Sequence, residues 1–319
     1  MTRRWWLWGC IISSAVAIAL VAWAFHVYVY NVRHEIGINL SHPTWTSDGK
    51  EIVFEREYVD TEIIWLLMGF HSTTKANYSV MKVAADGGKP KVLVENAWNC
   101  GCSPKLPLVA YVTGKPGFSG KDDELWILDL RTGKKWMLAS NENKGTHEMT
   151  WYWSPSTDQI LYCTQDMPCC VGDPWGKDRV DVYAKLRLSS ESRIKSFIPY
   201  WSRDGFIYLQ VDFFGSDGTE QHKGYKIAPG TWQVTETKAG EESHAELLDL
   251  AEAWKLPPPP SDGIPSEYLH YCGLSPDGKK IAFSPKRHSA SAYGPKMVVR
   301  DRATGEEKVI VDYSREERE

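Results

Sequence analysis

The chain has 319 residues and a formal net charge of −4, with acidic and basic residues spread along its whole length. This length suits one large domain plus a short additional segment, and the balanced charge excludes the basic surface that nucleic-acid binding needs. The sequence contains 15 tryptophans. Most of those beyond the first 23 residues fall at repeated positions, where burial in a core is expected.

The first thirty residues predict a membrane anchor. Arg3 and Arg4 precede an apolar run from Trp5 to Tyr30 that is free of acidic and basic residues apart from His26. The run is longer than the ~20 residues that cross a bilayer as a helix, and aromatic residues near both of its ends are typical of the two membrane interfaces. The residues that we expect to mark this transmembrane helix are Trp5, Trp8, Leu20, Trp23, Tyr28 and Tyr30.

A cleaved signal peptide is the alternative for this segment, because Ala22-Trp23-Ala24 resembles a cleavage site. The apolar run continues past Ala24 and exceeds the usual length of a signal peptide, which favours a retained anchor. Positive residues ahead of the run indicate that residues 1–4 are cytoplasmic. The sequence therefore predicts a single-pass protein of the cytoplasmic (inner) membrane. Residues 1–35 form the cytoplasmic tip and anchor, and residues 36–319 form the domain on the periplasmic side.

A short unit occurs five times after the anchor, at intervals of about fifty residues with one longer interval. Its clearest copy spans residues 274–283. Pro276-Asp277-Gly278 has the composition of a tight turn, and the apolar run that follows it is typical of a buried strand. The other copies begin at Trp45, Cys102, Trp153 and Trp201.

Each copy is followed by a second pair of strand-like runs; in several copies these are joined at a glycine, for example Gly133 and Gly305. A glycine turn between two alternating runs predicts a β-hairpin. Two hairpins make a four-stranded sheet, and copies of such a sheet bury both faces when they stack around an axis. The prediction is an all-β fold, a β-propeller of about five to six four-stranded blades.

This repeat resembles the TolB-like, WD-type-like propeller repeat, in which Trp-Ser-Pro-Asp-Gly-Lys precedes a buried strand. Residues 274–283 match that pattern except for the tryptophan, and the copies at Trp153 and Trp201 keep its Trp-Ser start. The resemblance covers roughly residues 42–314 and implies the propeller fold. It implies little about function, because this scaffold carries binding modules, accessory subunits and enzyme domains.

Two insertions interrupt the repeats. Residues 59–74 are an apolar insertion within the first repeat, and residues 238–266 contain a helical pattern that ends at the proline run 257–260. Strand order places both on the face where the first strand of every blade begins, called here the start face. The first insertion is either a strand pair packed on the next blade or a contact surface for a membrane or a partner. The residues assigned to that contact surface are Ile63, Ile64, Trp65, Leu66, Leu67, Met68 and Phe70.

Cysteine usage fits an exported domain. Cys163 is close in sequence to Cys169 and Cys170, so we expect one disulfide that links Cys163 to Cys169 or to Cys170. A metal site would have to join Cys100 and Cys102 to Cys169 and Cys170, and this spacing is not that of a standard zinc site. We therefore expect no metal.

No catalytic motif is present. The sequence lacks a Gly-x-Ser-x-Gly elbow, a His-Glu-x-x-His pair, a glycine-rich phosphate loop and a haem-attachment motif. Several histidines fall in predicted loops of the start face, where ordinary polar loops explain them better than a metal or cofactor surface. These histidines are His71, His147, His222, His244 and His288.

Taken together, these patterns predict a membrane-anchored, non-catalytic β-propeller that acts as an accessory subunit. It would dock on a membrane protein complex or an envelope partner, contact the bilayer through its helix, and need no catalytic residue and no cofactor. A ligand-sensing or envelope-transport module like TolB is the alternative, although the extra amino-terminal domain of that family is missing. An enzyme with a site in the start-face loops is the third and least favoured hypothesis.

Overall fold

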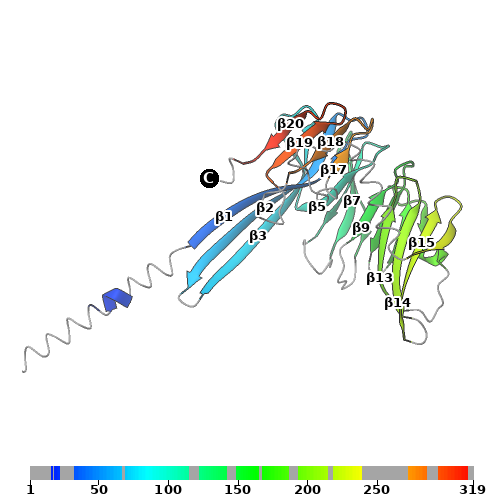
Figure 1. Ribbon diagram of the computed structural model, residues 1–319, viewed down its shortest axis with the longest axis horizontal. Coiled ribbons are helices and arrows are strands. Elements are labelled where there is room, and N and C mark those ends of the chain that lie inside the picture. The colour runs from blue at the N-terminus through cyan, green and yellow to red at the C-terminus, as the bar shows by residue number, and fades with distance from the viewer. Residues whose placement is uncertain are drawn as a thin grey trace, which may run out of the picture.

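The described part of the computed structural model is an all-β chain. Its strands form five four-stranded antiparallel sheets, and helix in this part is restricted to a few residues before position 22 and to α2 (Val182–Lys185). The sheets follow one another as the blades of a β-propeller (Figure 1). The described residues are 16, 18–21, 32–66, 69–114, 122–141, 149–164, 167–186, 193–214, 218–238, 272–285 and 294–314.

The strands of each sheet lie in chain order, so every blade is an up-and-down meander. Blade I consists of β1 (Val32–Trp45), β2 (Glu51–Leu66), β3 (Gly69–Ala84) and β4 (Lys91–Glu95). Blade II consists of β5 (Ala97–Cys102), β6 (Leu108–Thr113), β7 (Glu124–Asp129) and β8 (Lys135–Ser140). Blade III consists of β9 (Thr150–Trp153), β10 (Ile160–Thr164), β11 (Met167–Gly172) and β12 (Arg179–Asp181). Blade IV consists of β13 (Arg193–Trp201), β14 (Ile207–Phe214), β15 (Glu220–Ala228) and β16 (Gln233–Thr237). Blade V consists of β17 (Cys272–Leu274), β18 (Lys280–Phe283), β19 (Lys296–Asp301) and β20 (Glu307–Asp312).

The repeated unit forms the turn between the first two strands of a blade. In blade V the Ser275 hydroxyl donates to Asp277 Oδ1 over 2.6 Å, and the N–H of Gly278 donates to the Ser275 carbonyl over 2.8 Å. Thr46 and Asp48 make the same side-chain contact in blade I over 2.7 Å. Gly278 has a φ of +70°, which glycine adopts without a steric penalty. The sequence repeat therefore encodes one hydrogen-bonded turn in successive blades.

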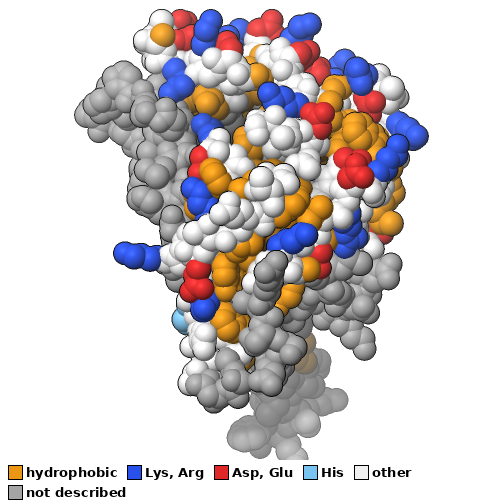
Figure 2. Space-filling view, turned by 90° about the vertical axis from the view of Figure 1, so that its right-hand side faces the viewer, with side chains coloured by type: hydrophobic (Ala, Val, Ile, Leu, Met, Phe, Trp, Pro, Cys, Tyr) orange, Lys and Arg blue, Asp and Glu red, His pale blue; other side chains and the backbone are white. Residues whose placement is uncertain are grey.

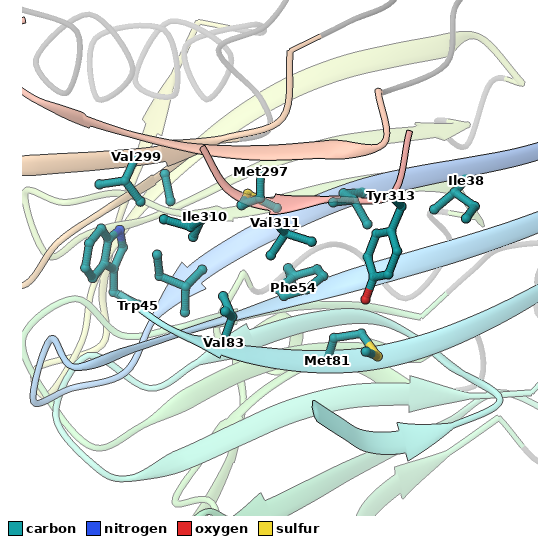
Figure 3. Packing of buried hydrophobic residues seen from close by; sticks show 13 residues of the cluster. Ile38, Trp45, Phe54, Met81, Val83, Met297, Val299, Ile310, Val311 and Tyr313 are labelled. Carbon is teal, nitrogen blue, oxygen red and sulfur yellow. The ribbon is translucent and has the colours of Figure 1, made fainter. Parts of the chain in front are cut away.

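Two tryptophans of the repeat tie neighbouring blades together. Trp45 of blade I donates from its indole nitrogen to the carbonyl of Gly273 in blade V over 2.8 Å. Trp153 of blade III donates in the same way to Gly101 of blade II over 3.0 Å. Trp45 also belongs to the apolar cluster that joins blades V and I (Figure 3). These contacts therefore place blade V beside blade I and blade II beside blade III.

Blade IV packs against blade III through a second apolar cluster, which includes Leu161 and Trp201. Figure 2 shows the side of the molecule on which blade IV lies. Hydrophobic side chains gather there in bands between lysines, arginines and acidic residues, and Ile198 of β13 is 52% exposed. Charges of both signs alternate on the visible part of this face, so it has no single electrostatic character.

Blade I carries an arm that leaves the body of the propeller (Figure 1). β2 pairs with β3 from end to end, and Val32 at the start of β1 lies opposite Ile64 near the end of β2. Residues 59–66 and 69–74 of the insertion therefore do not form a loop, because they lengthen two strands of the sheet. Of the two interpretations offered above, the strand pair is present, but it projects away from the other blades and does not pack on the next one.

Most of the predicted anchor lies outside the described residues. The described residues within it, 16 and 18–21, are helical, and Leu20 is exposed. Within the part of the chain that the structure describes, no helix is long and apolar enough to cross a membrane. The remaining parts of these predictions that lie outside the described residues are Trp5, Trp8, Trp23, Tyr28, Tyr30, Leu67, Met68 and residues 239–266.

Candidate functional site

A buried carboxylate, Glu55, is the centre of a polar cluster in blade I. Glu55 is 6% exposed and lies on β2 between the repeat turn and the arm. Its Oε2 accepts the backbone N–H of Asn99 from blade II over 2.6 Å, and its Oε1 accepts the Ser41 hydroxyl over 3.2 Å. Nδ1 of His42 lies 3.5 Å from Oε2. These donors offset the cost of removing a charged group from water, which is large for an unpaired carboxylate.

The backbone around Glu55 is irregular on both blades. His42 and Asn99 have φ angles of +49° and +47°, in the left-handed region that L residues rarely adopt, although Asn and His adopt it more often than most. In both β1 and β5 the pairing register with the next strand shifts at this residue. Two bulges on adjacent blades therefore meet at one carboxylate, and bulges and strained residues are concentrated at functional sites.

The contacts orient the imidazole of His42. Its Nδ1 lies 3.2 Å from the Ser41 hydroxyl and 3.5 Å from Glu55, while the side chain as a whole is 37% exposed. In the tautomer with a proton on Nδ1, the imidazole donates toward the carboxylate. A carboxylate beside one imidazole nitrogen orients the ring. His42 is therefore a candidate for proton transfer.

A second carboxylate lies on the same face of β2. Glu57 is two residues beyond Glu55, a spacing that places both side chains on one side of the sheet about 6–7 Å apart along the strand. Glu57 accepts the Tyr78 hydroxyl over 2.6 Å and the Asn39 side-chain amide over 2.8 Å. Two carboxylates, an imidazole and a phenol thus share one small region, a set of groups typical of acid–base chemistry.

Two free thiols are buried beside this cluster on β5. Burial, with the Glu55 carboxylate as a second cause, raises the pKa of Cys100 well above its ordinary value of 9.0. Burial also raises the pKa of Cys102 to about 12. Because the thiolate is the reactive form, both cysteines act as packing groups. Within the described residues, no group of three or more His, Cys, Asp and Glu side chains could hold a metal ion.

The three cysteines named as disulfide candidates lie in blade III, away from Glu55. A disulfide joins Cys163 of β10 to Cys169 of β11. Cys170 is buried and not part of the disulfide, and its sulfur accepts the Nε–H of Arg179 over 3.1 Å. Burial raises the pKa of Cys170, so this thiol is also protonated at neutral pH.

The histidines highlighted in the sequence do not converge on one site in the described part of the chain. His71 lies in β3 near the end of the arm. His222 lies in β15, half exposed, with Nδ1 2.8 Å from Asp212 Oδ1. The other three, His147, His244 and His288, lie outside the described residues.

Sequence reasoning missed His42 and Glu55. Ser41 and His42 precede the first repeat copy, where they look like the end of a linker. One signal was available: polar residues alternate with apolar ones through Asn39 and Ser41, and again through Glu55 and Glu57. Alternation in two paired strands predicts one polar face in an otherwise apolar sheet, and that face carries the cluster.

No protein-family model matches this sequence, and a search of curated proteins finds none that is similar. Solved structures with a similar fold include an oligogalacturonate lyase from Vibrio parahaemolyticus, with 13% identity and a TM-score of 0.39 over 90% of this chain and 86% of that one. They also include the β-propeller domain of the trilobed protease from Pyrococcus furiosus, with 14% identity and a TM-score of 0.42 over 86% of this chain and 71% of that one. A puromycin hydrolase has 12% identity and a TM-score of 0.40, over 89% of this chain and 38% of that one.

These comparisons agree with the propeller fold and correct the functional prediction. The sequence predicted a non-catalytic accessory subunit, whereas the similar structures are enzymes or the propeller domains of enzymes. That prediction is therefore contradicted. At identities of this order the comparisons assign no activity to this chain, which leaves the geometry around Glu55 as the basis for a proposal.

Proposed function

We propose that this protein is a membrane-tethered propeller enzyme in which His42, oriented by Glu55, acts as the general base of a hydrolytic reaction. The observation that carries the proposal is the position of His42 Nδ1, 3.5 Å from a carboxylate that is buried and held by the N–H of Asn99. A partly exposed imidazole that is oriented by a buried carboxylate is a typical general base.

The neighbouring groups favour water as the nucleophile. Ser41 is 5% exposed and its hydroxyl is used by Glu55, and the buried thiol of Cys100 stays protonated. Neither side chain is available for covalent attack on a substrate. His42 would take the proton of an attacking water, while Glu55 stabilises the imidazolium that forms. Glu57 and Tyr78 supply the polar surface on which a hydroxylated or amide-bearing substrate would be held.

The test uses the purified full chain in mild detergent with p-nitrophenyl esters, p-nitrophenyl glycosides and peptide p-nitroanilides as substrates. A general base contributes roughly 10²- to 10⁴-fold to rate, so His42→Ala should reduce the hydrolysis rate by about that factor. His222→Ala is the matched control, because it removes another carboxylate-paired histidine at 2.8 Å. Absence of hydrolysis across the three substrate classes, or a rate that His42→Ala leaves unchanged, would refute the proposal.

The tether rests on the sequence. We propose that residues 1–35 form the cytoplasmic tip and a retained transmembrane anchor, and that the TolB-like propeller of residues 36–319 lies in the periplasm. The uninterrupted apolar run from Trp5 to Tyr30, with positive residues ahead of it, supports this arrangement. Five blades account for the described strands, and we take five as the blade number. Intact-mass measurement of the native protein tests the anchor, since a mature chain starting at Phe25 would show that it is cleaved.

A further inference from the structure

The arm of blade I lies outside the proposed catalytic centre and changes character along its length (Figure 1). Its middle is polar: Thr61 lies opposite Thr74, and their exposed hydroxyls are 3.3 Å apart. Its outer end is apolar, because β2 ends with four apolar residues from Ile63 to Leu66 and Trp65 lies opposite Phe70 of β3. An apolar strand end that projects from the body of a protein is typical of an interaction surface.

The register of the sheet places this apolar end beside the predicted anchor. Val32, the first residue of β1, lies opposite Ile64, and the apolar run of the sequence ends at Tyr30. Two residues of chain span at most about 7 Å. The end of the apolar run and the outer end of the β2–β3 hairpin are therefore close together whatever path the connecting residue takes.

We infer that the outer end of the arm inserts into the surface of the bilayer that holds the anchor, so that the propeller is attached to lipid at two neighbouring points. This inference rests on the proposed anchor. The apolar end of β2 is four residues long, which corresponds to about 13 Å of strand, close to the ~5–10 Å that interfacial amphipathic segments bury. Glu62 directly precedes these residues in β2 and limits the depth of insertion, because a carboxylate remains with the headgroups and water.

Insertion of the arm would also set the height of the catalytic centre above the membrane. Glu55 and Glu62 lie on one continuous strand, seven residues apart. At about 3.3 Å per residue the separation along the strand is roughly 23 Å. A substrate of this site would thus be held at most about 23 Å from the bilayer surface.

Photo-crosslinking of the full chain tests the inference. The protein is reconstituted in vesicles of phosphatidylethanolamine and phosphatidylglycerol, with benzoylphenylalanine in place of Trp65 or Phe70, and lipid adducts are measured by mass spectrometry. Ile18 of the apolar run is the anchor control, and Trp175 of blade III, which is 53% exposed, is the control for an exposed aromatic far from the arm. We expect adducts at 18, 65 and 70 and none at 175.

The outcomes separate the two proposals. Adducts at 18 without adducts at 65 or 70 would overturn the arm inference and leave the anchor standing. No adducts at 18 would overturn the anchor and, with it, the inference. Adducts at 175 equal to those at 65 would overturn the inference, because labelling would then reflect collision with vesicles.

A paired substitution gives an independent measurement. Trp65→Asp with Phe70→Asp changes one cross-strand pair of the arm, and Thr61→Asp with Thr74→Asp changes a pair four residues away on the same face. With the crosslinker at Leu66, the first variant should lower the lipid adduct yield by about tenfold, and the second should leave it within twofold. Retention of the Cys163–Cys169 disulfide and of the circular dichroism spectrum verifies folding. Equal losses in both variants would overturn the inference.

Discussion

Replacement of Glu55 separates the structural and the catalytic contributions of the proposed site. Glu55→Ala removes the acceptor of the Asn99 N–H, a contact of 2.6 Å between blades II and I, and leaves that half-buried donor without its carboxylate partner. It also removes the acceptor of the Ser41 hydroxyl. Breaking a buried, charge-assisted set of hydrogen bonds costs about 3–5 kcal/mol of unfolding free energy. Glu55→Gln keeps an oxygen of the same shape for Asn99 and should cost only about 1–2 kcal/mol.

The assay is urea unfolding of the full chain in mild detergent, followed by circular dichroism at pH 7. Glu57→Ala is the matched control, because Glu57 is two residues away but accepts hydrogen bonds only from side chains, those of Tyr78 and Asn39. Those donors can turn toward water, so the control should cost about 0.5–1.5 kcal/mol. Hydrolysis by the folded Glu55→Gln variant should fall by at least about tenfold, since an amide stabilises the imidazolium poorly.

Two results would refute this reasoning. If Glu55→Ala costs no more than Glu57→Ala, the Glu55 carboxylate is not the inter-blade acceptor described above. If Glu55→Gln hydrolyses substrate at the rate of the unaltered protein, Glu55 has only a structural role and does not orient His42 for catalysis.

Three further predictions concern the propeller body. Gly273→Ala should lower the free energy of unfolding by about 3 kcal/mol and Gly101→Ala by about 1 kcal/mol, because a Cβ at 273 would clash with a backbone carbonyl of blade I whereas one at 101 meets a side-chain ring. Equal thermal midpoints for the two variants would contradict this. The repeat hydroxyls of Thr46 and Ser275 lower the pKa of Asp48 and Asp277 below 3.8. The stability that these two carboxylates add is therefore complete above pH 3.8 and is lost as the pH falls below it. Replacing Asp48 and Asp277 with Asn should flatten the acid side of a plot of stability against pH, and an unchanged plot would contradict this prediction. N-ethylmaleimide at pH 8 should label the buried cysteines outside the disulfide only after unfolding, and peptide mapping that finds any of them labelled in the folded chain would disprove their burial. These thiols are Cys100, Cys102 and Cys170.

Local chemistry determined much of this fold, and the sequence was sufficient to predict it. The turn at Ser275 is closed by contacts with Asp277 and Gly278, all within a few residues, so its composition alone predicts its geometry. The recurrence of that turn predicts successive four-stranded meanders, and the structure contains five of them. The apolar run before residue 31 predicts an anchor for the same reason, since length and hydropathy along the chain decide whether a segment suits a bilayer.

The candidate site was decided only by the tertiary structure. Asn99 and Glu55 are 44 residues apart and lie on different blades, and their contact needs two register shifts that place His42 and Asn99 at positive φ. A bulge depends on how one strand is paired with its neighbour, so it has no reliable local signature. The arm is a similar case. The sequence indicates only an insertion at residues 59–74, and the pairing of β2 with β3 shows that residues 59–66 and 69–74 extend these two strands. Pairing between distant segments buries Glu55 and brings donors to it, and no periodicity along the chain encodes that burial.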